Sequence, residues 1–225
     1  MAKIRPSPSL RWFCIAAAAF LAIVVAAHLF ASPLRDLLDS SRVVRLDRAA
    51  WEYASSHSSS TALALMSLVS DLHGTVGILV LTATAAWGWQ RCGHLDACVR
   101  LLLAVPAGMV LNVLVKAAVQ RVRPDWALVE LPRSASFPSG HVAEATVFYG
   151  SLALEAAARG MRQVQRLALA LGAVAMIGLV AGSRVLLGVH FMSDCVGAAV
   201  EGMLWLAACF VGRPLRASPA PGGAR

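Results

Sequence analysis

Long apolar runs recur along the chain, and short polar segments separate them. Each run approaches the ~20 residues that an α-helix needs to cross the hydrocarbon core of a bilayer. The pattern therefore predicts an all-α integral membrane bundle of six transmembrane helices. The fourth span is the weakest of these, because Glu144 and Glu155 interrupt it. The predicted spans cover residues 12–31, 72–90, 101–118, 141–158, 167–187 and 191–211.

The polar segments between the spans differ in character. Residues 32–60 mix arginine, aspartate and serine, which is typical of an exterior loop with some amphipathic helix, and the pattern allows a further helix near 48–70. Residues 119–138 are rich in proline, so we expect an extended or turn-like segment there. The tail at 214–225 has a composition typical of disorder. We interpret residues 1–225 as a single transmembrane domain.

The composition supports a membrane protein and indicates its orientation. A hydrophobic content of 58% exceeds that of ordinary soluble domains. The net charge of +8 does not indicate a nucleic-acid partner, because the cations are spread along the chain and form no single basic patch. With both termini in the cytoplasm (N-in, C-in), the inside segments hold most of the lysines and arginines once Lys116, Arg123 and Arg184 are set aside. The first apolar run is long for a signal peptide and lacks a cleavage pattern, so we expect it to remain as an anchor.

Cysteine and carboxylate patterns indicate neither disulfides nor a metal. The five cysteines form no disulfide framework. Cys92, His94 and Cys98 lack the spacing of a zinc site. No cluster of carboxylates suggests a divalent cation, so we predict neither a metal nor another cofactor.

Lys116 and Arg123 mark the outer end of the third span. A lysine in the last turn of a helix complements the negative end of the helix dipole and can also snorkel to the interface. Taken alone, either cation is interpreted as an ordinary interfacial residue. A lysine here is nevertheless unusual, because arginine is by far the commoner cation in this chain.

Residues 138–141, Pro-Ser-Gly-His, open the fourth span. Ser139 is placed to cap the helix, and Gly140 lets a ligand approach the backbone closely. The free N–H groups at a helix start form an anion site. Capping explains the proline, the serine and the glycine, but it does not explain His141.

Arg184, His190 and Asp194 lie at the boundary between the last two spans. Charged side chains at membrane depth are costly and are therefore candidates for function. If the sixth helix begins near His190, Asp194 lies one turn further along the same face. Its carboxylate can then bond one ring nitrogen and leave the other as a nucleophile. A core histidine satisfied by a nearby acid is the alternative for this pair taken alone.

All three segments fall on the outer face of the six-span arrangement. Three cations, two histidines, one carboxylate and a helix N-terminus would meet there. Cations match the oxygens of a phosphate, and two histidines permit a nucleophile and a general acid. Jointly, the three segments predict phosphoryl chemistry in which cations of the protein neutralise the charge.

The same residues resemble a known family. K-x6-R-P at 116–124, P-S-G-H at 138–141 and S-R-x5-H-x3-D at 183–194 are similar to the three signatures of the type 2 phosphatidic acid phosphatase superfamily. Every fixed position is present in the right order, and the signature-bearing core covers residues 100–211. The six-span pattern resembles that of the bacterial membrane members.

The resemblance implies a role for each matching position. His190 would attack phosphorus and form a phosphohistidine, with Asp194 orienting it. His141 would protonate the leaving oxygen and later help to activate water. The phosphoryl oxygens would be held by Lys116, Arg123, Ser139, Gly140 and Arg184.

Four further polar residues lie outside these signatures. Glu144 falls in the first turn of the fourth span, and we favour a structural role such as capping or pairing with an arginine. Asp71 and His73 stand at the outer end of the second span, where we favour an interfacial role over one at the entrance. Glu201 lies beyond Asp194 on a similar helical face and has no assigned role.

The sequence therefore predicts a metal-independent phosphatase of lipid phosphates in a bacterial inner (plasma) membrane, with its site facing the periplasm. The resemblance implies undecaprenyl diphosphate, phosphatidylglycerol phosphate, phosphatidic acid or lipid A phosphate as the substrate, so the partners are a lipid phosphate and the bilayer. A lipid-to-lipid phosphotransferase shares the first half-reaction and stays open. A non-catalytic transporter is the other alternative, but it predicts an internal pseudo-symmetry that the sequence does not show.

Overall fold

The computed structural model describes residues 8–211, with side chains from Phe13 onward, and over that range it contains helices and no strands. The all-α prediction is therefore confirmed. The predicted disordered tail lies outside the described residues. The helices are α1 (Pro8–Leu29), α2 (Ala31–Leu38), α3 (Ser41–Ser56), α4 (Ser60–Leu72), α5 (Thr75–Arg91), α6 (Leu95–Val119), α7 (Gly140–Ala157), α8 (Gln163–Leu186) and α9 (Met192–Phe210).

Helices α6, α8 and α9 are each long and apolar enough to cross a membrane. Two helix pairs also qualify if each is one bent span: α1 with α2, bent by 65°, and α4 with α5, bent by 62°. The described residues thus hold three to five candidate spans, and the predicted count of six is not confirmed. The predicted span that is left over coincides with α7, whose 18 residues include Glu144 and Glu155.

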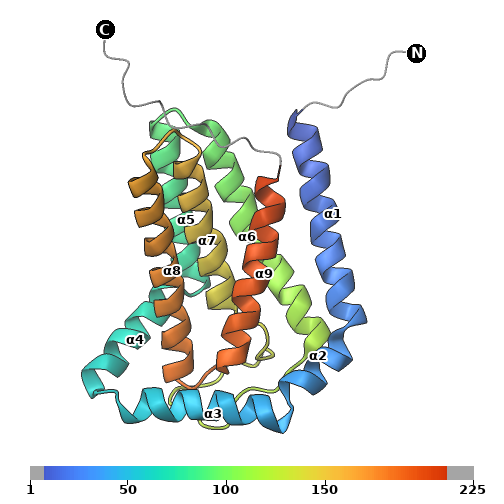
Figure 1. The fold of residues 1–225 in the computed structure, drawn as a ribbon, viewed down its shortest axis with the longest axis vertical. Coiled ribbons are helices and arrows are strands. Elements are labelled where there is room, and N and C mark those ends of the chain that lie inside the picture. Colours follow the sequence, from blue (N-terminus) through green and yellow to red (C-terminus); the bar gives the residue numbers. More distant parts are fainter. Residues whose placement is uncertain (1–7, 212–225) are drawn as a thin grey trace.

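The polar segments are more helical than their sequences suggest. Helices α2 and α3 occupy most of 32–60, and α3 lies across the lower end of the bundle (Figure 1). The further helix expected near 48–70 is divided between α3 and α4, because the chain leaves the helical conformation after Ser56. Between α6 and α7 the chain forms no helix, in agreement with the proline-rich sequence.

Helix α7 is at the centre of the bundle and packs against α5, α6, α8 and α9. Glycines bring α9 close to it: a Cβ on Gly202 would lie only 2.8 Å from the Cβ of Thr146, and one on Gly150 would lie 2.4 Å from Leu206 Cδ2. Small residues at a membrane helix interface permit this kind of backbone approach. The starts of α7 and α9, which carry His141 and Asp194, are consequently held side by side.

Ion pairs hold the other end of α7. The buried carboxylate of Glu155 accepts from Arg100 Nε at 2.6 Å and from Arg159 Nη1 at 2.6 Å. The Arg159 guanidinium also lies over the ring of Trp89, 4.6 Å from its centroid. A buried carboxylate is tolerated when partners neutralise it and fill its lone pairs, so α7 can carry Glu155 within an otherwise apolar bundle.

Candidate active site

The three sequence motifs converge at one end of the bundle, as predicted. The last turn of α6, the first turns of α7 and α9 and the end of α8 all lie at the lower end in Figure 1, beside α3. The non-helical segment 120–139 crosses this end and joins α6 to α7. Residues far apart in the sequence are therefore neighbours here.

His190 and Asp194 form a facing pair. His190 precedes α9 and Asp194 lies in its first turn, so the carboxylate oxygen Oδ2 stands 3.5 Å from His190 Nδ1. Oδ2 also accepts from Ser136 Oγ at 2.5 Å and from the backbone N–H of Phe191 at 3.0 Å. Asp194 is completely buried, and these donors fix the direction of its carboxylate.

The other ring nitrogen of His190 faces a cation. Arg123 Nη1 lies 3.3 Å from His190 Nε2. Because a guanidinium can only donate, Nε2 accepts and carries the lone pair, while Nδ1 carries the proton towards Asp194. Burial lowers the pKa of His190 to about 3, and the hydrogen bond and charge of Asp194 offset this only in part. The imidazole is therefore neutral, and its Nε2 lone pair is directed at Arg123.

Lys116 and Arg123 donate hydrogen bonds to the same stretch of backbone, residues 134–136. Lys116 Nζ donates to the carbonyl oxygens of Ala135 at 3.0 Å and Ser136 at 3.3 Å, so the lysine points into the site and does not snorkel. Arg123 Nε donates to Ser134 O at 2.8 Å, and its Nη1 donates to Val189 O at 2.7 Å. Burial lowers the pKa of Arg123, but a guanidinium stays charged in a protein.

Arg184 completes the group of cations. It is almost fully buried at the end of α8 and donates to Ser70 Oγ of α4. Its Nε is buried and has no hydrogen-bond partner among the described residues. Arg184 lies within electrostatic range of Arg123, and we expect the two guanidinium groups to border a common space. An anion in that space would be stabilised by both.

The motif at the start of α7 supplies the opposite wall. Ser139 occupies the N-cap position, but its hydroxyl makes no capping hydrogen bond, so the proposed cap is absent. Gly140 is confined, since a Cβ there would lie 3.3 Å from Asn112 Oδ1 and 3.5 Å from Glu144 Oε1. The backbone N–H groups of this first turn form the positive end of a helix dipole.

His141 lies within electrostatic range of His190 and faces the corner between α4 and α5. A Cβ on Gly74 at that corner would lie 3.8 Å from His141 Nε2. His73, expected to be interfacial, is in fact buried, with Nε2 2.7 Å from Tyr149 Oη and Nδ1 2.8 Å from Val69 O. The interfacial interpretation of His73 is therefore wrong. The His73 side chain connects the α4–α5 corner to α7. Asp71 is exposed and lies within electrostatic range of Arg184.

Two buried glutamates, one in α7 and one in α9, lie close to the site. Glu201 accepts from Asn112 Nδ2 at 2.8 Å, and its second oxygen is buried without a hydrogen-bond partner among the described residues. Glu144 forms no ion pair with an arginine in that part of the chain; its electrostatic neighbours are Lys116 and Glu201. Both carboxyl groups are close enough to Lys116 to interact with it electrostatically.

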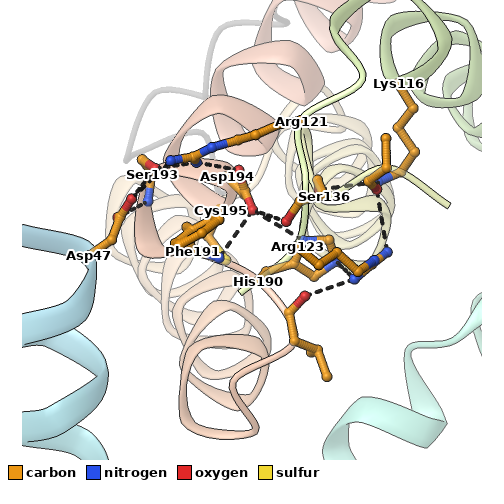
Figure 2. A network of polar contacts seen from close by, with 12 residues as sticks. Asp47, Lys116, Arg121, Arg123, Ser136, His190, Phe191, Ser193, Asp194 and Cys195 are labelled. Atoms are coloured by element: carbon orange, nitrogen blue, oxygen red, sulfur yellow. Dashed lines mark hydrogen bonds and ion pairs between the residues drawn. The ribbon is translucent and has the colours of Figure 1, made fainter. Parts of the chain in front are cut away.

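Three residues of this region escaped the sequence analysis: Arg121, Ser136 and Asp47. Arg121 is buried and its Nη1 donates to Asp194 Oδ1 at 2.7 Å. Asp47, on α3, accepts from the backbone N–H of Ser193 at 2.8 Å. No sequence signal singled them out, because each is an ordinary polar residue in a polar segment. Arg121 and Ser136 contact the Asp194 carboxylate, whereas Asp47 joins the same network through Ser193 and Arg121 (Figure 2).

The chain resembles known proteins in both sequence and fold. Residues 97–217 match the family model described as the PAP2 superfamily. Phosphatidylglycerophosphatase B of Bacillus subtilis (strain 168) is 36% identical over 110 residues, which cover 46% of this chain and 52% of that protein, so the match spans about half of the relative's length.

A solved structure is similar over a larger share. It is the crystal structure described as the first transmembrane PAP2 type phosphatidylglycerolphosphate phosphatase from Bacillus subtilis. Its TM-score is 0.68 at 26% sequence identity, with 83% of this chain and 93% of that chain covered. The family model covers more than half of the present chain, including every residue of the three motifs. The chain is a membrane protein that belongs to the PAP2 superfamily.

Proposed function

We propose that this protein is a membrane phosphatase that hydrolyses lipid phosphates through a phosphohistidine at His190. One observation carries the proposal: His190 Nε2, with Asp194 behind the ring, points its lone pair at Arg123 in a space that cations line. A neutral imidazole aimed into an anion-binding space has the geometry of a nucleophile towards phosphorus. Membership of the PAP2 superfamily supports the same chemistry.

The proposed first step forms one bond and breaks another. His190 Nε2 attacks phosphorus, and the bond from phosphorus to the lipid oxygen breaks. His141 donates a proton to that departing oxygen, while Asp194 stabilises the positive charge that develops on the His190 ring. In the second step His141 takes a proton from water, whose oxygen attacks phosphorus, and the bond to His190 breaks. Inorganic phosphate and the free lipid are the products.

The cations and the helix start would hold the phosphoryl oxygens during both steps. Fixed donors aimed at developing charge stabilise a transition state without reorganisation. Because these donors carry the charge, the proposal requires no metal. Among the described residues, no group of three or more His, Cys, Asp or Glu side chains is arranged to hold a metal ion. The proposed donors are Lys116, Arg123, Ser139, Gly140 and Arg184.

We favour phosphatidylglycerol phosphate as the substrate class, because both relatives are named for that activity. Undecaprenyl diphosphate, phosphatidic acid and lipid A phosphate are the other candidates. A lipid can keep its chains in the bilayer while its phosphate reaches the end of the bundle where the site lies (Figure 1). The N-in, C-in arrangement proposed from the charge pattern puts this end on the periplasmic side of a bacterial inner membrane.

The test is phosphate release by the purified full-length protein from a panel of lipid mono- and diphosphates in detergent micelles. We expect release from at least one lipid phosphate, and its loss in His190→Ala. His57→Ala, which changes an exposed histidine at the end of α3, is the matched control and should retain activity. Unchanged release in His190→Ala would overturn the proposal. Labelled phosphate that appears on a lipid, and not in solution, would instead identify a phosphotransferase.

A further inference from the structure

Arg121 is buried at the outer end of the bundle, with a side chain that is inaccessible to solvent. It comes from the loop that follows α6, yet its guanidinium reaches the end of α2. It also reaches the middle of α3 and the first turn of α9 (Figure 2). The guanidinium also lies on the face of Phe191, 4.0 Å from the ring centroid. Its hydrogen-bond acceptors are Leu38 O at 2.6 Å, Asp39 Oδ1 at 3.1 Å, Asp47 Oδ2 at 3.3 Å, Ser193 Oγ at 2.8 Å and Asp194 Oδ1 at 2.7 Å.

Asp47 is the second member of this network. It is 2% exposed and accepts from the backbone N–H of Ser193 at 2.8 Å and from Ser193 Oγ at 2.6 Å. The first N–H groups of a helix have no partner within the helix, and a carboxylate there is stabilised by the helix dipole. Asp47 thus caps α9 from a different helix. It fixes the turn that carries Asp194.

The arrangement divides the two oxygens of Asp194 between two tasks. Oδ1 is occupied by Arg121, whereas Oδ2 receives Ser136 and faces His190. Among the described residues, Arg121 is the only lysine or arginine that forms an ion pair with Asp194. A completely buried carboxylate without such a partner is strongly destabilised in its charged form. The partner therefore maintains both the charge and the direction of the carboxylate.

We propose that Arg121 and Asp47 are positioning residues for catalysis: they hold Asp194, and through it the His190 imidazole, in the reactive orientation. The inference rests on the proposed phosphatase function. Neither residue needs to touch the substrate. Asp47 and the α2–α3 segment lie outside the part of the chain that matches the family model, which begins at residue 97. This segment is then part of the support of the active site as well as a connection between helices.

The test compares Arg121→Met, Arg121→Lys and Asp47→Asn with the wild type, using the full-length protein. The readouts are kcat, KM, the inhibition constant of inorganic phosphate and the thermal unfolding midpoint. We expect kcat to fall about 100-fold in Arg121→Met. This is the upper end of the activity losses caused by mutating residues that orient the ligands of a metal, which act through another residue in the same way. The inhibition constant of phosphate should stay within about threefold, because Lys116, Arg123 and Arg184 do not contact Arg121.

The conservative variants separate positioning from a general loss of structure. Lysine keeps the positive charge beside Asp194 but supplies fewer directed donors, so Arg121→Lys should recover about tenfold of the lost kcat. In Asp47→Asn the amide oxygen still accepts from Ser193 N, and we expect a loss of about tenfold. Arg42→Met, on the exposed side of α3, is the matched control and should match the wild type.

Two results would overturn the inference. One is an Arg121→Met protein with kcat within about twofold of the wild type. The other is a loss of kcat accompanied by an equal loss of phosphate binding, without recovery in the lysine variant. If Arg121→Met does not fold, the lysine variant and Asp47→Asn decide the question by the same readouts. Failure of the proposed function is distinct, because the wild type itself would then release no phosphate.

Discussion

Replacing Asp194 by asparagine tests how the reactive ring is oriented. The carboxylate is surrounded by donors: Arg121 Nη1 at 2.7 Å from Oδ1, with Ser136 Oγ and Phe191 N at 2.5 and 3.0 Å from Oδ2. In either orientation of the asparagine side chain, its NH₂ group faces a hydrogen-bond donor, where the carboxylate had an accepting oxygen. Because the guanidinium is charged, the amide oxygen is expected to face Arg121, and the NH₂ group then faces His190 Nδ1. That contact favours the tautomer with its proton on Nε2, which removes the nucleophilic lone pair.

The magnitude follows from the same contacts. An amide in place of a carboxylate behind a catalytic histidine costs about 10⁴-fold in kcat in serine proteases. Here Arg123 also holds Nε2, so we expect a loss of about 10³- to 10⁴-fold, or about 4–5.5 kcal/mol at 1.36 kcal/mol per tenfold. KM should change by less than about threefold, since the cations proposed to bind phosphate keep their partners.

The assay is steady-state phosphate release by Asp194→Asn, together with inhibition by inorganic phosphate. Asp36→Asn removes an exposed acid on α2 and serves as the control, with activity expected to equal the wild type. If Asp194→Asn keeps kcat within about tenfold of the wild type, the carboxylate does not set the tautomer, and the proposed role of Asp194 is wrong.

Three further predictions concern packing, pH and metal. A valine at Gly202 must move Thr146, which lies 2.8 Å from the added Cβ. Gly202→Val should therefore lower the free energy of unfolding by about 1–3 kcal/mol and reduce kcat. An unchanged denaturation midpoint would contradict this. Burial lowers the pKa of His190 to about 3, whereas the pKa of a histidine in the unfolded chain is about 6.5. Between these two values the unfolded chain binds the proton more tightly, so stability should fall as the pH drops from about 6.5 towards 3. The fall should be less steep in His190→Gln. Phosphate release should persist in EDTA and be inhibited by vanadate, whereas a strict magnesium requirement would contradict the mechanism.

The sequence was informative where the chemistry itself limits the choice of residue. An imidazole, a carboxylate one helical turn away and cations at span ends form an unusual set in an apolar chain, and the structure brings His141, His190 and Asp194 to one end. Hydrophobic periodicity also located each helix of the main bundle. It did not give the number of spans. Helix α7 lies at the centre of the bundle but contains polar residues, and its acidic side chains are buried against partners from other helices, which the periodicity of α7 does not reveal.

The supporting residues could not be predicted for a physical reason. Arg121 stands two positions from Arg123, and both are arginines in a polar loop, but one is completely buried and the other is about half-buried. The difference arises from α2 and α3, which contribute Asp39 and Asp47 from a segment expected to be mainly loop. Such contacts depend on where α3 crosses the bundle, and local sequence patterns carry no information about that crossing.

The ion pairs of Glu155 have a consequence for the opposite end of the same helix. Glu155 forms ion pairs with Arg100 of α6 and with Arg159. His141 lies in the first turn of α7, 14 residues earlier, or about 21 Å away at 1.5 Å per residue. A helix behaves as a stiff rod over this length. These ion pairs thus fix the position of His141 along the axis of α7 from the opposite end of the helix. Loosening them would shift the proposed proton donor along this axis without altering any residue of the proposed active site.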